Sequence, residues 1–218
     1  MPEPVTIPIS FFEVVVEYEQ PAIRLLADRA TIVQGILDAW KPWTPNIDDM
    51  ELRTVGKPSE QGVLLKLPLQ RASFFIGAAF CRFSRDDSDW ETADETIAIF
   101  DAAVLALMKF SGVVAGTRRT SIGLHLQPRT KHYMEILRPF MSSLLTALEK
   151  EPLRTMAVVA KWANRKVTID GSGSLVNGLF LKFERDFAPS SPYTEIASQL
   201  KSDEEQLFRL LGVEEARG

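Results

Sequence analysis

The sequence predicts an α+β fold in which the order strand, helix, three strands, helix (β-α-β-β-β-α) occurs twice. Segments with a two-residue apolar period alternate with segments of helical period, and the same order begins again after Gly112. The chain has 218 residues, of which 45% are hydrophobic and 25% are charged, as is typical of a globular protein with its own core. We therefore expect one globular body over residues 1–218. It would consist of two pseudo-duplicated repeats, 1–112 and 113–218, each with an antiparallel sheet and helices packed on one face.

The first repeat opens with Phe11–Tyr18, a β-branched and aromatic segment that predicts a strand with Phe12, Val14, Val16 and Tyr18 on one face. Pro21 suits the first turn of a helix, and apolar residues recur at helical spacing up to Trp40. Turn residues then separate three predicted strands, Met50–Val55, Val63–Leu69 and Ser73–Ser84.

A long helix closes the first repeat. Ser88 and Glu91 have the spacing of a capping box, so we expect the helix to begin there. Gly112 suits its end, because glycine adopts the left-handed conformation of a helix C-terminus without strain.

The second repeat begins with a strand over residues 113–127, followed by a helix over about 130–148. Asn164 and the segment Asp170–Gly173 are typical of turns, and Ser191-Pro192 is typical of a helix start. These signals delimit three further strands, Thr155–Trp162, Lys166–Ile169 and Leu175–Arg185, and a final helix.

The N-terminal residues lack the basic region and continuous apolar stretch of a secretory signal. No apolar run approaches the roughly 18 residues that a membrane-spanning helix needs. Cys81 is the only cysteine, so it cannot form an internal disulfide. We therefore expect a cytoplasmic protein with no membrane partner.

The formal net charge of −4 is unevenly distributed along the chain. Residues 113–169 hold ten basic and three acidic residues, whereas both flanking segments are acidic. Such asymmetry indicates either an anionic partner or cations that pair with the acidic segments or lie in water. We favour the second interpretation, because the basic residues are spread over several elements without interleaved aromatic residues.

Several short segments resemble a sporadically distributed, uncharacterised bacterial protein family of unknown function. They span nearly the whole chain and are Pro8–Val16, Trp90-Glu91, Gly116–Arg118, Leu179–Phe183 and Glu204–Phe208. After the glycine-arginine segment the family usually has tyrosine, asparagine and arginine, where this chain has Arg119–Ser121. The resemblance implies a fold of this architecture and no established activity.

No sequence motif supplies a reaction centre. Cys81 lies in a predicted core strand without a nearby base to stabilise a thiolate. Ser198 and Lys201 match Ser-x-x-Lys, but the usual partner motifs are missing. Gly171–Ser174 matches neither a nucleophile elbow nor a phosphate loop, which favours a hairpin turn.

A metal site is also not indicated by the sequence. Neither His125 nor His132 belongs to a Cys/His cluster or a His-Glu-x-x-His helix, and zinc needs three or four protein ligands. We expect no metal and no cofactor.

The candidate ligand-binding residues are Glu13, Glu17, Arg118, Arg119 and His125. Arg118 shares a strand face with Ile122 and Leu124, so we expect it to point inward and to need a partner, since burying a lone guanidinium is costly. Glu13 or Glu17 would provide a carboxylate if the first strands of the two repeats meet. Two interpretations stay open, a structural ion pair and a polar centre in an inter-repeat cleft.

The leading hypothesis is a non-enzymatic binding or interaction module that recognises a small ligand or a partner protein at the inter-repeat cleft, with a homodimer as one arrangement. One alternative is an enzyme whose acid and base residues are scattered along the chain. The other is a weak nucleic-acid binder that uses the basic segment 113–169, which a pI near 5.4 disfavours.

Overall fold

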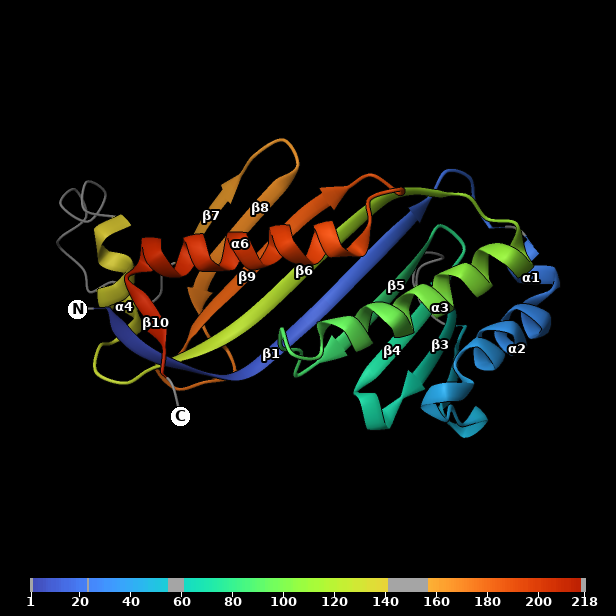
Figure 1. Cartoon of the computed structure of the whole chain (residues 1–218), viewed down its shortest axis with the longest axis horizontal. Helices are drawn as coiled ribbons and strands as arrows, with labels where there is room; N and C mark the ends of the chain where they lie inside the picture. The colour runs from blue at the N-terminus through green and yellow to red at the C-terminus, as the bar shows by residue number, and fades with distance from the viewer. Residues whose placement is uncertain (1, 23, 55–60, 141–156, 217–218) are drawn as a thin grey trace. The chain divides into compact units, whose positions relative to one another are not determined.

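The computed structural model describes residues 2–22, 24–54, 61–140 and 157–216 (Figure 1). Its main strands are β1 (Glu3–Tyr18), β2 (Met50–Arg53), β3 (Gly62–Leu67), β4 (Ala72–Gly77), β5 (Phe80–Asp86), β6 (Ala115–Pro128), β7 (Ala157–Lys161), β8 (Arg165–Gly171) and β9 (Leu179–Phe187). Its helices are α1 (Arg24–Ala27), α2 (Arg29–Ala39), α3 (Ala93–Ser111), α4 (Tyr133–Leu137) and α6 (Tyr193–Leu211). The predicted α+β class is confirmed.

Over the described residues the strands form one sheet in the order β2-β3-β4-β5-β1-β6-β9-β8-β7. The successive hairpin strands β2 to β5 and β7 to β9 pair in antiparallel fashion. A short strand, β10 (Val213–Glu215), pairs in parallel with the start of β1. The predicted antiparallel hairpins are therefore present, and β7 ends this strand order.

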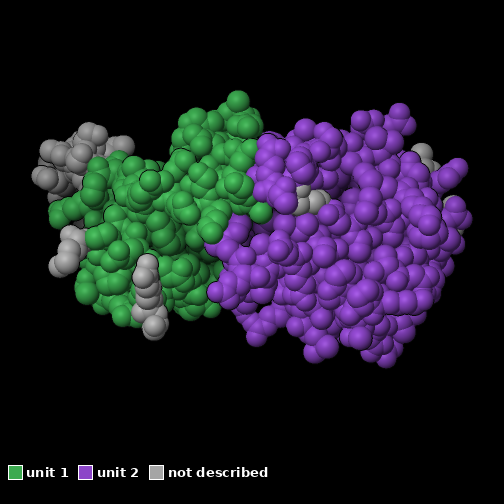
Figure 2. Space-filling model, viewed as in Figure 1, with its two compact units in different colours: residues 1–10, 122–185, 197–218 green, residues 11–121, 186–196 purple. Residues whose placement is uncertain are grey.

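The chain divides into two compact units (Figure 2). Unit 1 consists of residues 1–10, 122–185 and 197–218, and unit 2 consists of residues 11–121 and 186–196. Strands β1 and β6 each contribute residues to both units. The division into repeats at residue 112 stays a prediction.

In unit 2, α2 and α3 pack side by side on one face of the sheet (Figure 1). Phe83 of β5 packs on Phe100 of α3, with ring centroids 5.6 Å apart. The indole nitrogen of Trp40 donates to the carbonyl oxygen of Ile99 at 2.9 Å. The two helices are thus fixed to each other and to the strands by large buried side chains, whose burial is the main stabilising contribution.

The face predicted for the first strand is present in unit 2. Val14 and Val16 are at most 1% exposed, and Phe12 and Tyr18 pack against the same core. Glu13 lies between them in the sequence, so its side chain projects from the opposite face of β1.

In unit 1, α6 crosses strands β8 and β9 (Figure 1). Leu179, Leu181 and Phe183 of β9 are at most 2% exposed. Leu200 and Leu207 provide the buried face of α6. The apolar spacing of both segments therefore leads to one packed layer of helix on sheet.

The helix expected from Pro21 to Trp40 is wrong as a single element. The structure has two helices, α1 and α2, separated at Asp28. Asp28 has φ −111° and ψ 27°, which is outside the helical region. Apolar residues keep their helical spacing on both sides of Asp28, so the sequence pattern does not reveal the break between the two helices.

The strand expected over Ser73–Ser84 is two strands, β4 and β5, joined by a tight turn at Ala78 and Ala79. The carbonyl oxygens of Ala78 and Ala79 accept hydrogen bonds from the amides of Ala22 and Tyr18. The apolar run in the sequence gives little sign of this turn, because the turn is held by the backbone amides of Tyr18 and Ala22 and not by turn-forming side chains.

The helix expected over residues 130–148 is shorter where the structure describes it. The His132 ring nitrogen Nδ1 accepts from the Met134 amide at the N-terminus of α4, and α4 gives way to a 3-10 turn, Arg138–Phe140. Residues 141–148, like the predicted strand ends Val55 and Thr155, lie outside the described residues.

A buried carboxylate, Glu3, fixes the start of β1 within unit 1. Its side chain accepts from the Thr130 amide (2.6 Å), the Thr130 hydroxyl (2.5 Å) and the Lys131 amide (3.1 Å). Burial by itself raises the pKa of the Glu3 carboxyl, but the hydrogen bonds from Thr130 and Lys131 outweigh this effect and lower the pKa overall.

We predict that Glu3→Gln lowers the urea midpoint at neutral pH, because the amide cannot replace a charged acceptor of these donors. A carboxyl whose folded pKa lies below its unfolded value stabilises the fold above the unfolded pKa, and this stabilisation is lost as the pH falls through the folded pKa. The gap between wild type and variant should therefore close in acid. Glu214→Gln, at an exposed carboxylate of β10, is the control. A gap that is unchanged in acid would contradict the role of Glu3.

Candidate functional site

Arg118 lies on the inward face of β6, where the sequence places it, and is 7% exposed. Its Nη2 atom donates to the Pro189 carbonyl at 2.9 Å and its Nη1 atom donates to the Ser191 carbonyl at 3.2 Å. Its guanidinium also lies over the Phe100 ring, 6.0 Å from the centroid. Arg118 therefore binds the connection between β9 and α6 to the core of unit 2.

The partner expected for Arg118 is wrong. Glu13 and Glu17 project from the face of β1 opposite to the buried Val14 and Val16, so they cannot reach an inward-facing guanidinium. Glu13 instead lies 3.8 Å from Arg82, and Glu17 is exposed.

Arg119 occupies the other face of β6 and is exposed. Its Nε atom donates to Asp186 Oδ1 at 3.0 Å. Both side chains are more than one third exposed, so this pair contributes little to stability. Glu13, Glu17 and Arg119 thus point away from the inward Arg118, and all four residues belong to unit 2.

His125 belongs to unit 1 and contacts the loop between β8 and β9. Its Nδ1 atom lies 2.8 Å from the Ser172 hydroxyl, and its ring lies 4.8 Å from that of Phe180. Ser172 Oγ already accepts from the Ser174 and Leu175 amides, at 3.1 and 3.0 Å. The Ser172 hydroxyl therefore donates a hydrogen bond to His125 Nδ1, which places the ring proton of His125 on Nε2.

This geometry identifies the Ser172–His125 pair as a structural contact. Two backbone amides hold Ser172 Oγ in place, so its hydroxyl fixes the loop after β8 against the imidazole. Burial lowers the pKa of His125, which favours the neutral imidazole. The expected turn at Asp170–Gly173 lies further along the chain, because Asp170 and Gly171 belong to β8 and the turn residues of the connection to β9 are Val176 and Asn177.

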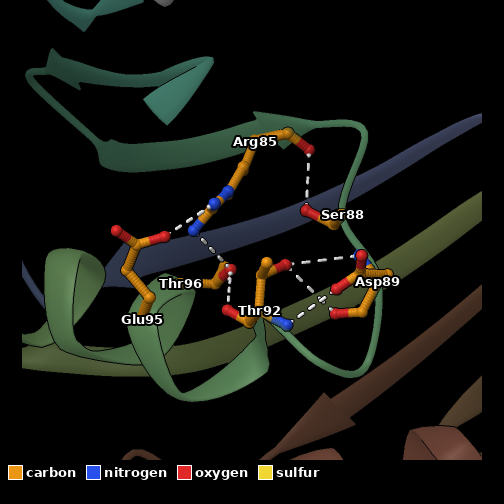
Figure 3. A network of polar contacts seen from close by, with 6 residues as sticks. All are labelled: Arg85, Ser88, Asp89, Thr92, Glu95 and Thr96. Atoms are coloured by element: carbon orange, nitrogen blue, oxygen red, sulfur yellow. Dashed lines mark hydrogen bonds and ion pairs between the residues drawn. The ribbon is translucent and has the colours of Figure 1, made fainter. Parts of the chain in front are cut away.

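A polar network at the start of α3 replaces the predicted capping box (Figure 3). The helix begins at Ala93, and Asp89 Oδ1 accepts from the Thr92 amide at 2.7 Å. The Ser88 hydroxyl instead donates back to the Arg85 carbonyl at 3.2 Å. The capping box at Ser88 and Glu91 is therefore wrong, because α3 begins at Ala93 with Thr92, and not Ser88, at its N-cap position.

Arg85 is the centre of this network and is 8% exposed. It donates to Thr96 Oγ1 at 3.0 Å and lies 2.7 Å from Glu95 Oε2 (Figure 3). Thr96 in turn donates to the Thr92 carbonyl at 2.8 Å. The end of β5 is thus joined to the first turn of α3 by a charge-assisted network, which sequence reasoning missed.

A second network, also missed, joins α6 to the sheet of unit 1. Arg165 and Arg185 lie directly opposite each other on β8 and β9. Asp203 of α6 lies 2.7 Å from Arg185 and 3.6 Å from Arg165, which offsets their repulsion. Arg165 also lies over the ring of Trp162, 4.5 Å from its centroid, and Trp162 is 46% exposed.

Four of the eight cations of the basic segment that the structure describes form ion pairs or buried hydrogen bonds within the fold. Ion pairs are formed by Arg119 with Asp186 (3.0 Å), Arg165 with Asp203 (3.6 Å) and Lys166 with Glu184 (2.8 Å). Arg118 is buried against backbone carbonyls. Pairing within the fold therefore accounts for half of the described cations, while Lys150 and Arg154 lie outside the described residues.

The edge strand β7 presents a different kind of surface. It pairs with β8 in the register Ala157↔Asp170 to Lys161↔Lys166, and the Trp162 amide donates to the Arg165 carbonyl just beyond it. Antiparallel ladders bond every second residue pair. Val158 and Ala160, in phase with Trp162, therefore bond to β8.

The remaining residues of β7, namely Ala157, Val159 and Lys161, consequently direct their N–H and C=O groups away from β8. No other strand among the described residues pairs with this edge. The same residues are exposed, with Val159 at 59%. The edge thus combines two features, backbone groups that no described strand pairs and an exposed apolar side chain.

The described ranges contain neither a cluster of metal-binding side chains nor a membrane-spanning helix. No group of three or more His, Cys, Asp or Glu side chains there could hold a metal ion. No described helix combines the length and apolar character needed to cross a bilayer.

Comparisons with known proteins do not assign a family. No family model and no curated protein matches the chain. One similar solved structure is described as "Crystal structure of putative glycine cleavage system transcriptional repressor", with 11% identity, 94% of each chain covered and a TM-score of 0.19. That TM-score carries no argument about this chain, and the resemblance to an uncharacterised bacterial family stays a prediction.

Cys81 is 1% exposed, and burial raises the pKa of its thiol to about 12. We predict that a thiol reagent modifies Cys81 slowly in the folded protein and rapidly after denaturation, since the thiolate is the reactive form. Leu69→Cys, at a side chain that is 83% exposed, provides a fast thiol in the same molecule as an internal control. Equal labelling rates for both thiols under native conditions would contradict the assignment.

We predict that Arg118→Ala costs about 2–4 kcal/mol in urea titration, because the Pro189 and Ser191 carbonyls lose charged donors. Arg118→Met retains much of the packing on Phe100 but not the donors, and should lose most of the same stability. Arg119→Ala is the matched control on the exposed face of β6 and should cost less than about 1 kcal/mol. An unchanged midpoint for Arg118→Ala would show that the guanidinium does not hold the 186–196 segment.

Proposed function

We propose that the protein is an interaction module that accepts an extended segment of a partner protein at the free edge of β7. Strand addition uses the main-chain donors and acceptors of an exposed sheet edge for affinity and alternate side chains for specificity. One observation carries this proposal. Ala157, Val159 and Lys161 have both outward-directed backbone groups and exposed side chains.

The protective features of natural edge strands are weak at β7. Such strands carry proline, bulges or inward-pointing charges that prevent pairing with other chains. The sequence of β7, Ala-Val-Val-Ala-Lys, has none of these within the strand and one charge at its end. By contrast, β2 at the other end of the strand order carries Glu51 and Arg53, which form an ion pair with each other.

The contacts of the candidate site residues support an interaction module over an enzyme. Arg118 donates to backbone carbonyls, His125 accepts a hydrogen bond from the Ser172 hydroxyl, and Arg119 pairs with Asp186. General acid–base catalysis needs groups free to exchange a proton with a substrate. These contacts instead hold segments of the fold in place.

Trp162 adds a candidate anchor at the end of β7. Tryptophan and arginine are enriched among residues that dominate binding energies at protein interfaces. Arg165 stacks on the indole ring and so limits its rotation before a partner binds. A preorganised side chain loses less conformational entropy on binding.

A selection from a library of short linear peptides tests the proposal. We predict that recovered peptides alternate β-branched and polar residues and that they protect the amides of Ala157, Val159 and Lys161 from hydrogen exchange. Val159→Pro removes an outward N–H without removing a bond to β8, so it should weaken peptide binding at least tenfold while the fold is retained.

Val159→Thr is the matched control, because it keeps the amide and the β-branched shape, and it should bind as the wild type does. Circular dichroism of each variant checks the fold. The proposal is overturned if no peptide is recovered, or if the recovered peptides bind the Val159→Pro variant unchanged.

A further inference from the structure

We propose that the partner at β7 is a second copy of this chain, paired with it through antiparallel β7 strands centred on Val159. This inference rests on the proposed function of β7 as a strand-accepting edge. A two-fold dimer requires a self-complementary surface, in which residue i of one copy faces residue j of the other and the reverse.

The backbone of β7 meets this requirement. Its outward residues, Ala157, Val159 and Lys161, are evenly spaced around Val159. When two strands pair about an axis at Val159, each Val159 faces its copy and each Ala157 faces a Lys161. All three positions then form closely hydrogen-bonded pairs, with about six inter-chain hydrogen bonds in total.

The Val159-centred register pairs all five residues of β7 with those of the copy, and the single charge of β7 disfavours registers shifted toward Lys161. In the Val159-centred register, the two Lys161 positions are four residues apart along the strands, roughly 13 Å. That separation exceeds the Debye length of about 8 Å at physiological ionic strength. A register centred on Ala160 halves this distance, and one centred on Lys161 places the two ammonium groups directly opposite, which is destabilising.

The outer face of the same register is apolar at its centre. Val159 is 59% exposed and would pack on its own copy across the axis. On β8 its neighbour is Thr168, an uncharged β-branched residue, so no charge lies directly beside the valine contact. A five-residue strand buries less than the roughly 1,600 Å² of a standard interface, and we expect a reversible dimer.

The test uses sedimentation velocity of the full chain over a range of concentrations. Wild type should form a reversible dimer. Val159→Lys and Val159→Glu should each weaken self-association at least tenfold, because each places two like charges across the axis. An equimolar mixture of the two variants should restore a dimer, and native mass spectrometry should find one copy of each variant in it.

The matched controls are Val176→Lys and Val176→Glu. Val176 is 93% exposed in the loop between β8 and β9, so these variants add the same charges away from β7 and should associate as the wild type does. The inference is overturned if wild type remains monomeric, if either Val159 variant dimerises normally, or if the mixture remains monomeric.

The same set of outcomes separates this inference from the proposed function. If selected peptides bind at β7 but the chain does not self-associate, the strand-accepting function stands and its partner is another protein. If neither peptides nor a second copy bind, both proposals fail.

Discussion

Along each antiparallel strand, successive residues alternate in the face of their side chain and in the direction of their backbone hydrogen bonds, and this structure depends on that constraint. It sets which side chains point to the core and which backbone groups are free at an edge. Arg118 is buried and Arg119 is exposed because they are neighbours on β6. By the same rule, Val158 bonds to β8 whereas Val159 directs its backbone outward.

The charged groups of the described residues mainly position helices and connections. Arg85 joins the end of β5 to the start of α3, and Arg185 joins β9 to α6 through Asp203. Arg118 binds two carbonyls of the segment that leads into α6. Since buried polar groups are costly unless they are hydrogen-bonded, each guanidinium limits where its element can lie.

The sequence period was sufficient to predict the α+β class, most strand positions and the inward face of Arg118. It could not predict the partner of Arg118, because the acceptors are backbone carbonyls 71 and 73 residues away, and backbone atoms leave no pattern in a sequence. The tight turn at Ala78 was missed for the same reason, as its carbonyl is held by the Ala22 amide. The face of a strand on which a side chain lies is therefore easier to predict from sequence than the partner of that side chain.

The importance of β7 was also beyond the sequence, although the strand itself was predicted. Strand order depends on contacts between distant segments, so the period of Ala157–Lys161 does not indicate that this strand ends the order. Edge position turns an ordinary apolar strand into a surface for association. The candidate residues Glu13, Glu17, Arg118, Arg119 and His125 were chosen for their chemistry, whereas the proposed surface is defined mainly by backbone geometry.

Residue-resolved amide exchange of β7 at two protein concentrations tests the central claim most directly. Our account predicts that Val158 and Ala160 are protected at both concentrations by their bonds to β8. Ala157, Val159 and Lys161 should exchange rapidly in dilute solution and gain protection at high concentration. Equal protection of all five amides, or alternate amides that stay unprotected at every concentration, would contradict the account.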